Sequence, residues 1–235
     1  MNDMTYLIEL EKVKKNITYL LSISQPCHQL YLDAVEFSPK AIRYMNYHYE
    51  DVAQLALSKI GDLIQYIKNP SLKLCLTAVK NEGNALKYIN QQNEQICLCA
   101  VKQNGYALRY VHEQNHDIIL EAVKQQPLAI KYAKFKDEHI WETTLAKNGM
   151  ALQYLELESQ TETLNLIAIQ NNPNAIQYVK QPSEALCMIA VKRKPHAIKY
   201  IANPSTLVYE TAIRRNPDIK FNSQFKRYKS ELFIS

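Results

Sequence analysis

The residues with the most recognisable chemistry in this chain are His112, Glu113 and His116, which form the string H-E-x-x-H. In zinc proteases, two histidines at this spacing on one face of a helix bind the metal, and the glutamate acts as the base beside the metal-bound water. A pattern this short also arises by chance, and it can work only on a helix. We therefore keep a zinc metalloprotease as a remote alternative and ask which element would carry the string.

Cysteines and glycines offer no second route to catalysis. Cys97 and Cys99 resemble half of a zinc site, but no second pair of ligands at zinc spacing accompanies them. The odd number of cysteines, without regular spacing, is typical of a reducing compartment. The sequence has neither a G-x-S-x-G motif nor a glycine-rich phosphate loop. We expect no catalytic residue, no metal, no cofactor and a cytoplasmic location.

An internal repeat with a period of 22 residues determines the elements around these residues. Tyrosines mark the period, with one longer step of 24 residues: Tyr44, Tyr66, Tyr88, Tyr110, Tyr132, Tyr154, Tyr178 and Tyr200. A small residue, which we call the repeat alanine, precedes each tyrosine by ten positions and also begins one more unit: Ala34, Ala56, Ala78, Ala100, Ala122, Thr144, Ala168, Ala190 and Ala212. Such a period predicts short helical units that must stack to bury their apolar faces.

Glycine and proline mark two helix starts in every repeat. One breaker stands five residues after each repeat alanine, at Pro39, Gly61, Gly83, Gly105, Pro127, Gly149, Pro173, Pro195 and Pro217. The other four prolines, Pro26, Pro70, Pro182 and Pro204, stand eight residues before a repeat alanine. Proline fits the first helical turn, and glycine lets the backbone reverse direction. Polar residues before the second breaker are expected to cap the second helix: Ser38, Asn104, Asn148, Asn172 and Asn216.

We therefore predict an all-α fold, an α-solenoid of about ten short helix-turn-helix repeats. Residues 26–221 form the solenoid, residues 1–25 an N-terminal cap with a degenerate repeat, and residues 222–235 a polar C-terminal cap. In this phase the H-E-x-x-H string falls in a turn, and Cys97 takes a core position. The tyrosines could form a platform on which bases stack, but their apolar neighbours favour amphipathic core residues whose hydroxyls reach a backbone carbonyl at the edge. The longer step, across residues 155–163, is the expected irregularity.

The repeat core AVKQNGYALRYV, which begins at Ala100, resembles the repeat of a domain of unknown function found in tandem in giant-virus, protist and bacterial proteins. The resemblance extends from about Ala34 to Ile201. It implies a helical repeat without an established activity, and it brings no site residues with it. The many asparagines, lysines, isoleucines and tyrosines, beside only 4 glycines, are typical of an AT-rich genome and favour a virus, a phage or an intracellular bacterium as the source.

Basic residues recur once per repeat in two rows, which form the candidate binding site. The first row directly precedes the tyrosines, and its cations are Arg43, Lys87, Arg109, Lys131 and Lys199. The second row follows the repeat alanine by two residues, and its cations are Lys80, Lys102, Lys124, Lys192 and Arg214. Such rows can follow a phosphate backbone, although lysine and arginine also occupy exposed helix positions for solubility.

The leading hypothesis is a non-catalytic scaffold that binds a protein partner along its repeated surface. For a virus or pathogen, the partner would be a host or defence factor in the host cytoplasm. The alternative is a binder of the nucleic-acid backbone, which the net charge of +5 permits. We expect no membrane partner, because no apolar stretch approaches the roughly 20 residues of a membrane-spanning helix. The sequence gives no indication of an oligomeric state.

Overall fold

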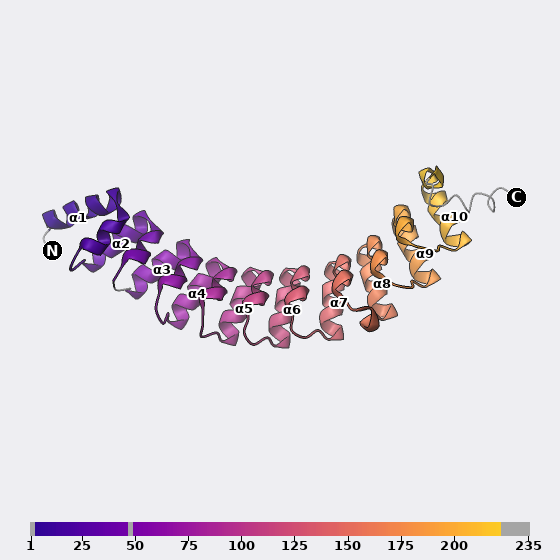
Figure 1. The fold of residues 1–235 in the computed structure, drawn as a ribbon, viewed down its shortest axis with the longest axis horizontal. Coiled ribbons are helices and arrows are strands. Elements are labelled where there is room, and N and C mark those ends of the chain that lie inside the picture. The colour runs from indigo at the N-terminus through magenta and orange to yellow at the C-terminus, as the bar shows by residue number, and fades with distance from the viewer. Residues whose placement is uncertain (1–2, 47–48, 222–235) are drawn as a thin grey trace. The chain divides into compact units, whose positions relative to one another are not determined.

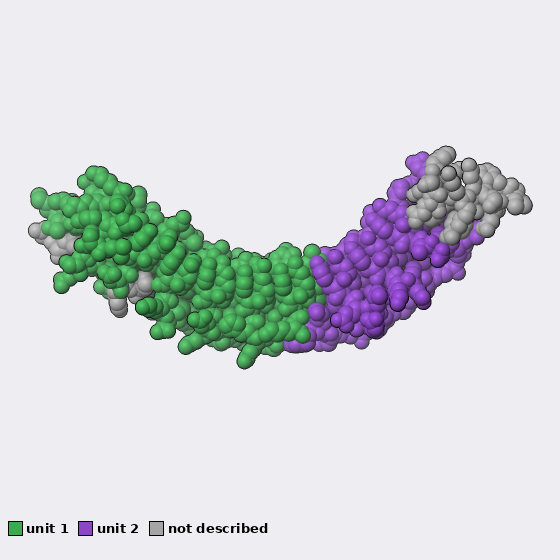
Figure 2. Space-filling model, viewed as in Figure 1, with its two compact units in different colours: residues 1–134 green, residues 135–235 purple. Residues whose placement is uncertain are grey.

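The computed structural model describes residues 3–46 and 49–221, and these residues contain helices and no β-strand. Each repeat consists of an α-helix, labelled in Figure 1, followed by a shorter 3₁₀-helix, which we denote η. The chain divides into two compact units, one up to Lys134 and the other from Phe135 onward (Figure 2). Within each unit, neighbouring α-helices pack against one another. The predicted α-solenoid of about ten helix-turn-helix repeats is confirmed.

The first unit contains six helix pairs. Its α-helices are α1 (Asp3–Lys15), α2 (His28–Phe37), α3 (Glu50–Lys59), α4 (Leu72–Asn81), α5 (Glu94–Gln103) and α6 (His116–Gln125). Its 3₁₀-helices are η1 (Ile17–Ser22), η2 (Pro39–Tyr44), η3 (Gly61–Tyr66), η4 (Gly83–Tyr88), η5 (Gly105–Tyr110) and η6 (Pro127–Tyr132). The weak first copy of the repeat thus forms a helix pair, α1 and η1, ahead of the regular units.

The second unit continues the same alternation. Its α-helices are α7 (Glu138–Lys147), α8 (Glu162–Asn171), α9 (Glu184–Arg193) and α10 (Thr206–Arg215). Its 3₁₀-helices are η7 (Gly149–Tyr154), η8 (Leu157–Ser159), η9 (Pro173–Tyr178), η10 (Pro195–Tyr200) and η11 (Pro217–Phe221). The additional helix η8 lies in the step of 24 residues, so the longer repeat takes up its extra length in a short helical turn. The C-terminal cap proposed for residues 222–235 lies outside the described residues.

The second element of each repeat is a 3₁₀-helix rather than an α-helix. We number each repeat after its α-helix, so that repeat 5 consists of α5 and η5. In repeat 5, the N–H of Val111 donates to the carbonyl of Leu108, three residues earlier. These helices start at the predicted glycine or proline and end at the tyrosine after six residues, which is long for this helix type. With three residues per turn, Tyr106 and Arg109 lie on one line of η5, away from the buried Ala107 and Leu108.

Side-chain caps define the helix starts. Of the five predicted caps of the second helices, Asn104, Asn148, Asn172 and Asn216 each accept a hydrogen bond from the N–H two residues later. The prediction for Ser38 is wrong, since its side chain makes no such bond.

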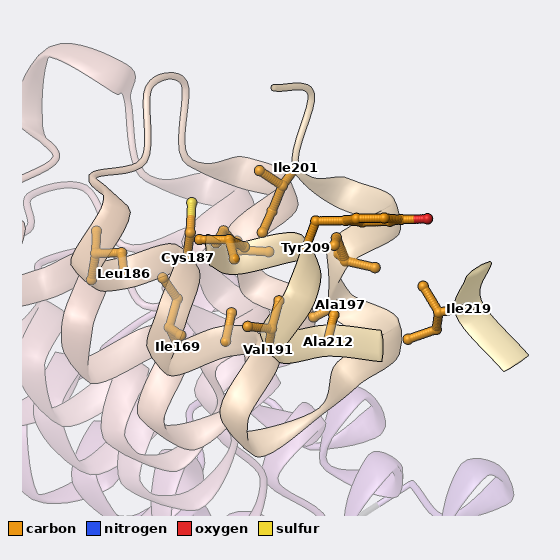
Figure 3. Close-up of a cluster of buried hydrophobic side chains, with 13 residues drawn as sticks. Ile169, Leu186, Cys187, Val191, Ala197, Ile201, Tyr209, Ala212 and Ile219 are labelled. Carbon is orange, nitrogen blue, oxygen red and sulfur yellow. The ribbon is translucent and has the colours of Figure 1, made fainter. Parts of the chain in front are cut away.

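The core lies between the layer of α-helices and the layer of 3₁₀-helices. In repeat 5 it consists of Ile96, Cys97, Ala100 and Val101 from α5, with Ala107 and Leu108 from η5, and all of them are buried. Figure 3 shows the corresponding cluster around α9 and α10, where Cys187, Val191 and Ala212 converge from the two helices. Helices of six to ten residues are not stable alone, so each repeat depends on its neighbours.

Two kinds of junction join consecutive repeats. At the first kind, the N–H of Gly83 donates to Oε1 of Gln103 in the next repeat over 2.7 Å, while Nε2 of Gln103 donates to the carbonyl of Asn81 over 3.2 Å. At the second kind, proline replaces glycine and has no N–H to donate. There Lys59, in the position of Gln103, only donates, to the carbonyl of Glu36 over 3.0 Å.

The residue types at these two positions change together along the chain. Each glycine is followed in the next repeat by an amide, in the pairs Gly61 and Asn81, Gly83 and Gln103, Gly105 and Gln125, and Gly149 and Asn171. Each proline is followed by a cation, in the pairs Pro39 and Lys59, Pro127 and Lys147, Pro173 and Arg193, and Pro195 and Arg215. An amide can both donate and accept, whereas a cation only donates. Within each unit, neighbouring helices are in more extensive contact at glycine junctions than at proline junctions.

Candidate functional site

The repeated tyrosines pack against the core from its margin, and Tyr200, for example, lies partly buried against the core cluster of α9 and α10. All eight tyrosines that mark the repeat are half-buried. The buried residues of the 3₁₀-helices are instead the alanine and the leucine or isoleucine that precede them, such as Ala107 and Leu108 in η5. Tyr110 ends its helix, so the outer part of its ring extends beyond these smaller residues and remains available at the surface.

The cations of the first row lie over these tyrosine rings. Lys87 Nζ lies 4.5 Å from the ring centre of Tyr88, and Lys199 Nζ lies 4.8 Å from that of Tyr200. Arg109 lies over Tyr110 in its own repeat, at 4.7 Å, and over Tyr132 in the next, at 5.8 Å. These distances lie within the roughly 6 Å of a cation–π contact, which stabilises an exposed pair by about 0.5–1 kcal/mol.

In the first unit, the cations and tyrosines of η5 and η6 form one continuous set of contacts. Lys131 lies over its own neighbour Tyr132, at 4.9 Å, and over Tyr106 in the preceding repeat, at 5.8 Å. Tyr106 and Tyr132 also meet edge to face, with ring centres 6.2 Å apart. The nearby ammonium of Lys131, followed by Arg109, lowers the pKa of Tyr132 below its usual value. We call this set, together with Tyr110, the tyrosine–cation ladder.

The second row lies on the other layer. Its residues occupy the exposed sides of the α-helices: Lys80 on α4, Lys102 on α5, Lys124 on α6, Lys192 on α9 and Arg214 on α10. On α5, Lys102 is nearly opposite the buried face of Ile96, Cys97 and Ala100. Because the core separates the two layers, a ligand lying along one row does not reach the other.

Some cations of both rows are paired with carboxylates. Lys87 Nζ lies 3.0 Å from Asp62 on η3, and this contact raises the pKa of the lysine. Lys124 Nζ lies 2.9 Å from Glu121 on its own helix. Exposed ion pairs contribute little to stability, but they reduce the charge that a row presents to a polyanion.

The H-E-x-x-H string does not lie on a helix. His112 and Glu113 lie in the turn after η5, and His116 is the first residue of α6. Asn115, within the same string, has a structural role, because it caps α6 by accepting from the N–H of Ile118. The arrangement that a zinc protease requires, with both histidines on one helical face, is therefore absent from this segment. Nowhere in the described parts of the chain do three or more His, Cys, Asp or Glu residues converge as metal ligands.

The cysteines follow the core interpretation. Cys97 is buried, and so are the residues at the same position of other repeats: Cys75, Ile119, Trp141, Cys187 and Tyr209. Burial, with Glu94 nearby, raises the pKa of the Cys97 thiol to about 11. Cys99 is only partly exposed. Asn165 is the polar exception at this position, since its side chain is 6% exposed and its Oδ1 has no partner among the described residues.

A row of glutamines that sequence reasoning missed joins the loops of consecutive repeats. Gln114 Nε2 donates to the carbonyls of Leu108 and Tyr132, while its Oε1 accepts from the N–H of Lys134 over 2.8 Å. Gln92, 22 residues earlier, makes the equivalent bonds to Leu86, Tyr110 and His112. The available signal was that the position eight residues before the repeat alanine holds glutamine in three repeats, at Gln92, Gln114 and Gln160, and proline in four. We call this the glutamine position.

Comparisons with known proteins agree with a repeat fold and name no activity. The model of one family, a domain of unknown function (DUF4116), matches residues 71–114. This segment comprises α4, η4, α5 and η5, which are two consecutive repeats. No curated protein and no solved structure matches the chain. Among the described residues, none of the helices combines the length and the apolar character needed to cross a membrane. The matched segment is thus similar to a helical repeat domain of unknown function.

Proposed function

We propose that the chain is a non-catalytic scaffold that binds a protein partner through the exposed side of its 3₁₀-helices. The tyrosine–cation ladder is the observation that carries this proposal. Tyrosine and arginine are enriched at the energetic centres of protein interfaces, where they offer large contact areas with a polar end. Because the pair recurs in consecutive repeats of the first unit, a partner can engage several such contacts at once.

A nucleic acid is the second candidate, because Arg43, Lys87, Arg109 and Lys131 all lie on the 3₁₀-layer of the first unit. Proteins that bind single strands offer aromatic faces on which bases stack. Here two cations already lie over Tyr132, and Lys87 is paired with Asp62. A base would have to displace these cations, so the contacts favour a protein partner.

The compartment and the kind of partner belong to the same proposal. All five cysteines are free thiols, which supports a reducing cytoplasm. The composition, typical of an AT-rich genome, supports a viral or bacterial source and therefore a host or defence protein as the partner. Both statements rest on composition and on the state of the thiols rather than on the ladder.

Two charge-reversed variants of equal charge test the proposal. One variant combines Arg109→Glu and Lys131→Glu on the 3₁₀-layer, and the other combines Lys102→Glu and Lys124→Glu on the α-layer. The tagged proteins are used to capture partners from host lysate, with and without nuclease, before mass spectrometry and nucleic-acid staining. We expect the unchanged chain to capture one protein in a stoichiometric amount, with or without nuclease. This capture should be lost in the variant of the 3₁₀-layer and kept in the variant of the α-layer.

Two outcomes would contradict the proposal. Capture of nucleic acid alone, with affinity that falls steeply as salt increases, would favour the second candidate. A protein partner lost with the α-layer variant but kept by the ladder variant would place the binding surface on the opposite layer.

A further inference from the structure

The glutamine position is occupied by proline in repeat 4, and a cavity opens there. The cavity has a volume of about 700 Å³ and lies between the loop around Pro70 and the loop of the next repeat. Its lining includes the buried residues Ile67, Cys75 and Ile96, together with Tyr88 and Asn90. A single water molecule takes about 30 Å³, so this space is large enough for a ligand group.

The hydrogen-bonding groups in this cavity are those that a glutamine side chain satisfies in the next two repeats. Gln92 donates to the carbonyls of Ile89 and Tyr110 and accepts from the N–H of His112, over 3.3, 2.9 and 3.0 Å. One repeat earlier, the equivalent groups are the carbonyls of Ile67 and Tyr88 and the N–H of Asn90. No described residue donates to these two carbonyls or accepts from this N–H.

The other residues near the cavity do not replace the glutamine. Repeat 2 also has proline at this position. Repeat 4 has Cys75 where repeat 2 has Tyr31, and the Cys75 thiol lies 3.9 Å from the carbonyl of Pro70. The thiol is too short to span to the next loop, so it does not take the place of the amide.

We infer that the cavity at Pro70 is a binding site for a primary carboxamide, the side chain of a glutamine presented by a partner protein. Its oxygen would accept from Asn90 N–H, and its NH₂ group would donate to the carbonyls of Tyr88 and Ile67. A carboxylate of the same size cannot donate to these two carbonyls, although Lys68 lies at the rim. The donor and acceptor pattern therefore selects the amide over the acid.

This inference deepens the proposed function, since it names one chemical group that the partner presents, but it can fail separately. If the ladder variant loses the partner while carboxamides do not bind at Pro70, the scaffold proposal stands and this site does not exist.

The test uses the full chain and small probes observed by ¹H–¹⁵N NMR. Propionamide reproduces the end of a glutamine side chain, propionate has no donor, and N,N-dimethylpropionamide has neither N–H. We expect propionamide alone to shift the Asn90 amide signal in a saturable way. In Pro70→Gln, the new side chain occupies the site, and the affinity should fall at least about tenfold, equivalent to about 1.4 kcal/mol. The control Pro70→Ala should bind like the unchanged chain.

A gain-of-binding variant makes the test independent of Pro70. Gln114→Ala, which does not line the Pro70 cavity, empties the equivalent position two repeats further on, and propionamide should then also shift the amide signal of Lys134. Equal shifts with all three probes, or unchanged binding in Pro70→Gln, would overturn the inference. A glutamine-containing peptide that binds while its glutamate analogue does not would extend the result from the free amide to a protein side chain.

Discussion

The close approach of Gly83 to the next repeat predicts an unusual response to alanine. Its backbone is not in the left-handed region, since no described glycine has a positive φ. At such a position Gly→Ala normally stabilises a protein by about 0.4–1 kcal/mol, because it restricts the unfolded chain. Here the added Cβ would lie 2.5 Å from the carbonyl oxygen of Ala100 and 2.8 Å from Oε1 of Gln103. The sign of the usual effect should therefore reverse.

The magnitude follows from how little the obstacle can move. The Ala100 carbonyl belongs to α5 and already accepts from the N–H of Asn104 over 2.9 Å, so relief requires the junction to open. Overpacking of this kind costs about 1–3 kcal/mol. After subtracting the gain in the unfolded chain, we expect Gly83→Ala to destabilise the junction by about 1–2 kcal/mol.

Native-state hydrogen exchange is the suitable assay, because repeat proteins often unfold in parts and a single midpoint then has no clear meaning. Amides of α4 and α5 should exchange faster in Gly83→Ala, with the largest change at the junction. The control is Pro195→Ala, where a Cβ is already accommodated and only about 0.4–1 kcal/mol should be lost. Unchanged or slower exchange in Gly83→Ala would refute the close-approach reasoning.

Three further predictions concern single side chains. Gln103→Lys keeps the donor to Asn81 but removes the acceptor of the buried Gly83 N–H, and native-state hydrogen exchange of α4 and α5 should show a loss of about 1–3 kcal/mol. Asn165→Cys replaces an amide whose buried oxygen has no partner among the described residues with the residue found at this position in three other repeats, and native-state hydrogen exchange of α8 should show a gain of about 1 kcal/mol. Burial raises the pKa of the Cys97 thiol from 9.0 to about 11. The thiol therefore loses its proton at a lower pH in the unfolded chain than in the folded one, so the free energy of unfolding should keep its full value below pH 9 and decline towards pH 11. Cys97→Ala should reduce this decline.

The repeat architecture was predictable because every glycine and proline occupies one of two fixed positions in the repeat. Glycine and proline act on the backbone directly, and their two positions per repeat fixed both helix starts before any packing was considered. The type of the second helix was not predictable in the same way. An α-helical period places Tyr110 beside Ala107 and Val111 in the core, whereas the 3₁₀ period and the helix end at Tyr110 leave its ring at the margin.

The candidate site was predictable in part. The residues of both rows were identified from their spacing, but their assignment to opposite layers required the faces of the two helices to be known. The cation–π contacts of Arg109 and Lys131 also depend on the half-exposed rings. The glutamine bridges of Gln92 and Gln114 were missed because each joins backbone groups of adjacent repeats, and a periodicity based on apolar residues does not register such bonds.

The two kinds of junction also restrict how this chain can change its length during evolution. Deleting residues 72–93 would place Gly61 before Gln103, so a glycine would still meet an amide. Deleting residues 162–183 would place Gly149 before Arg193, and the glycine N–H would face a side chain that cannot accept it. Both deletions remove one full period, yet only the first preserves the bonding between neighbours. The units are therefore not interchangeable, and in-frame losses or duplications are tolerated only between junctions of the same kind.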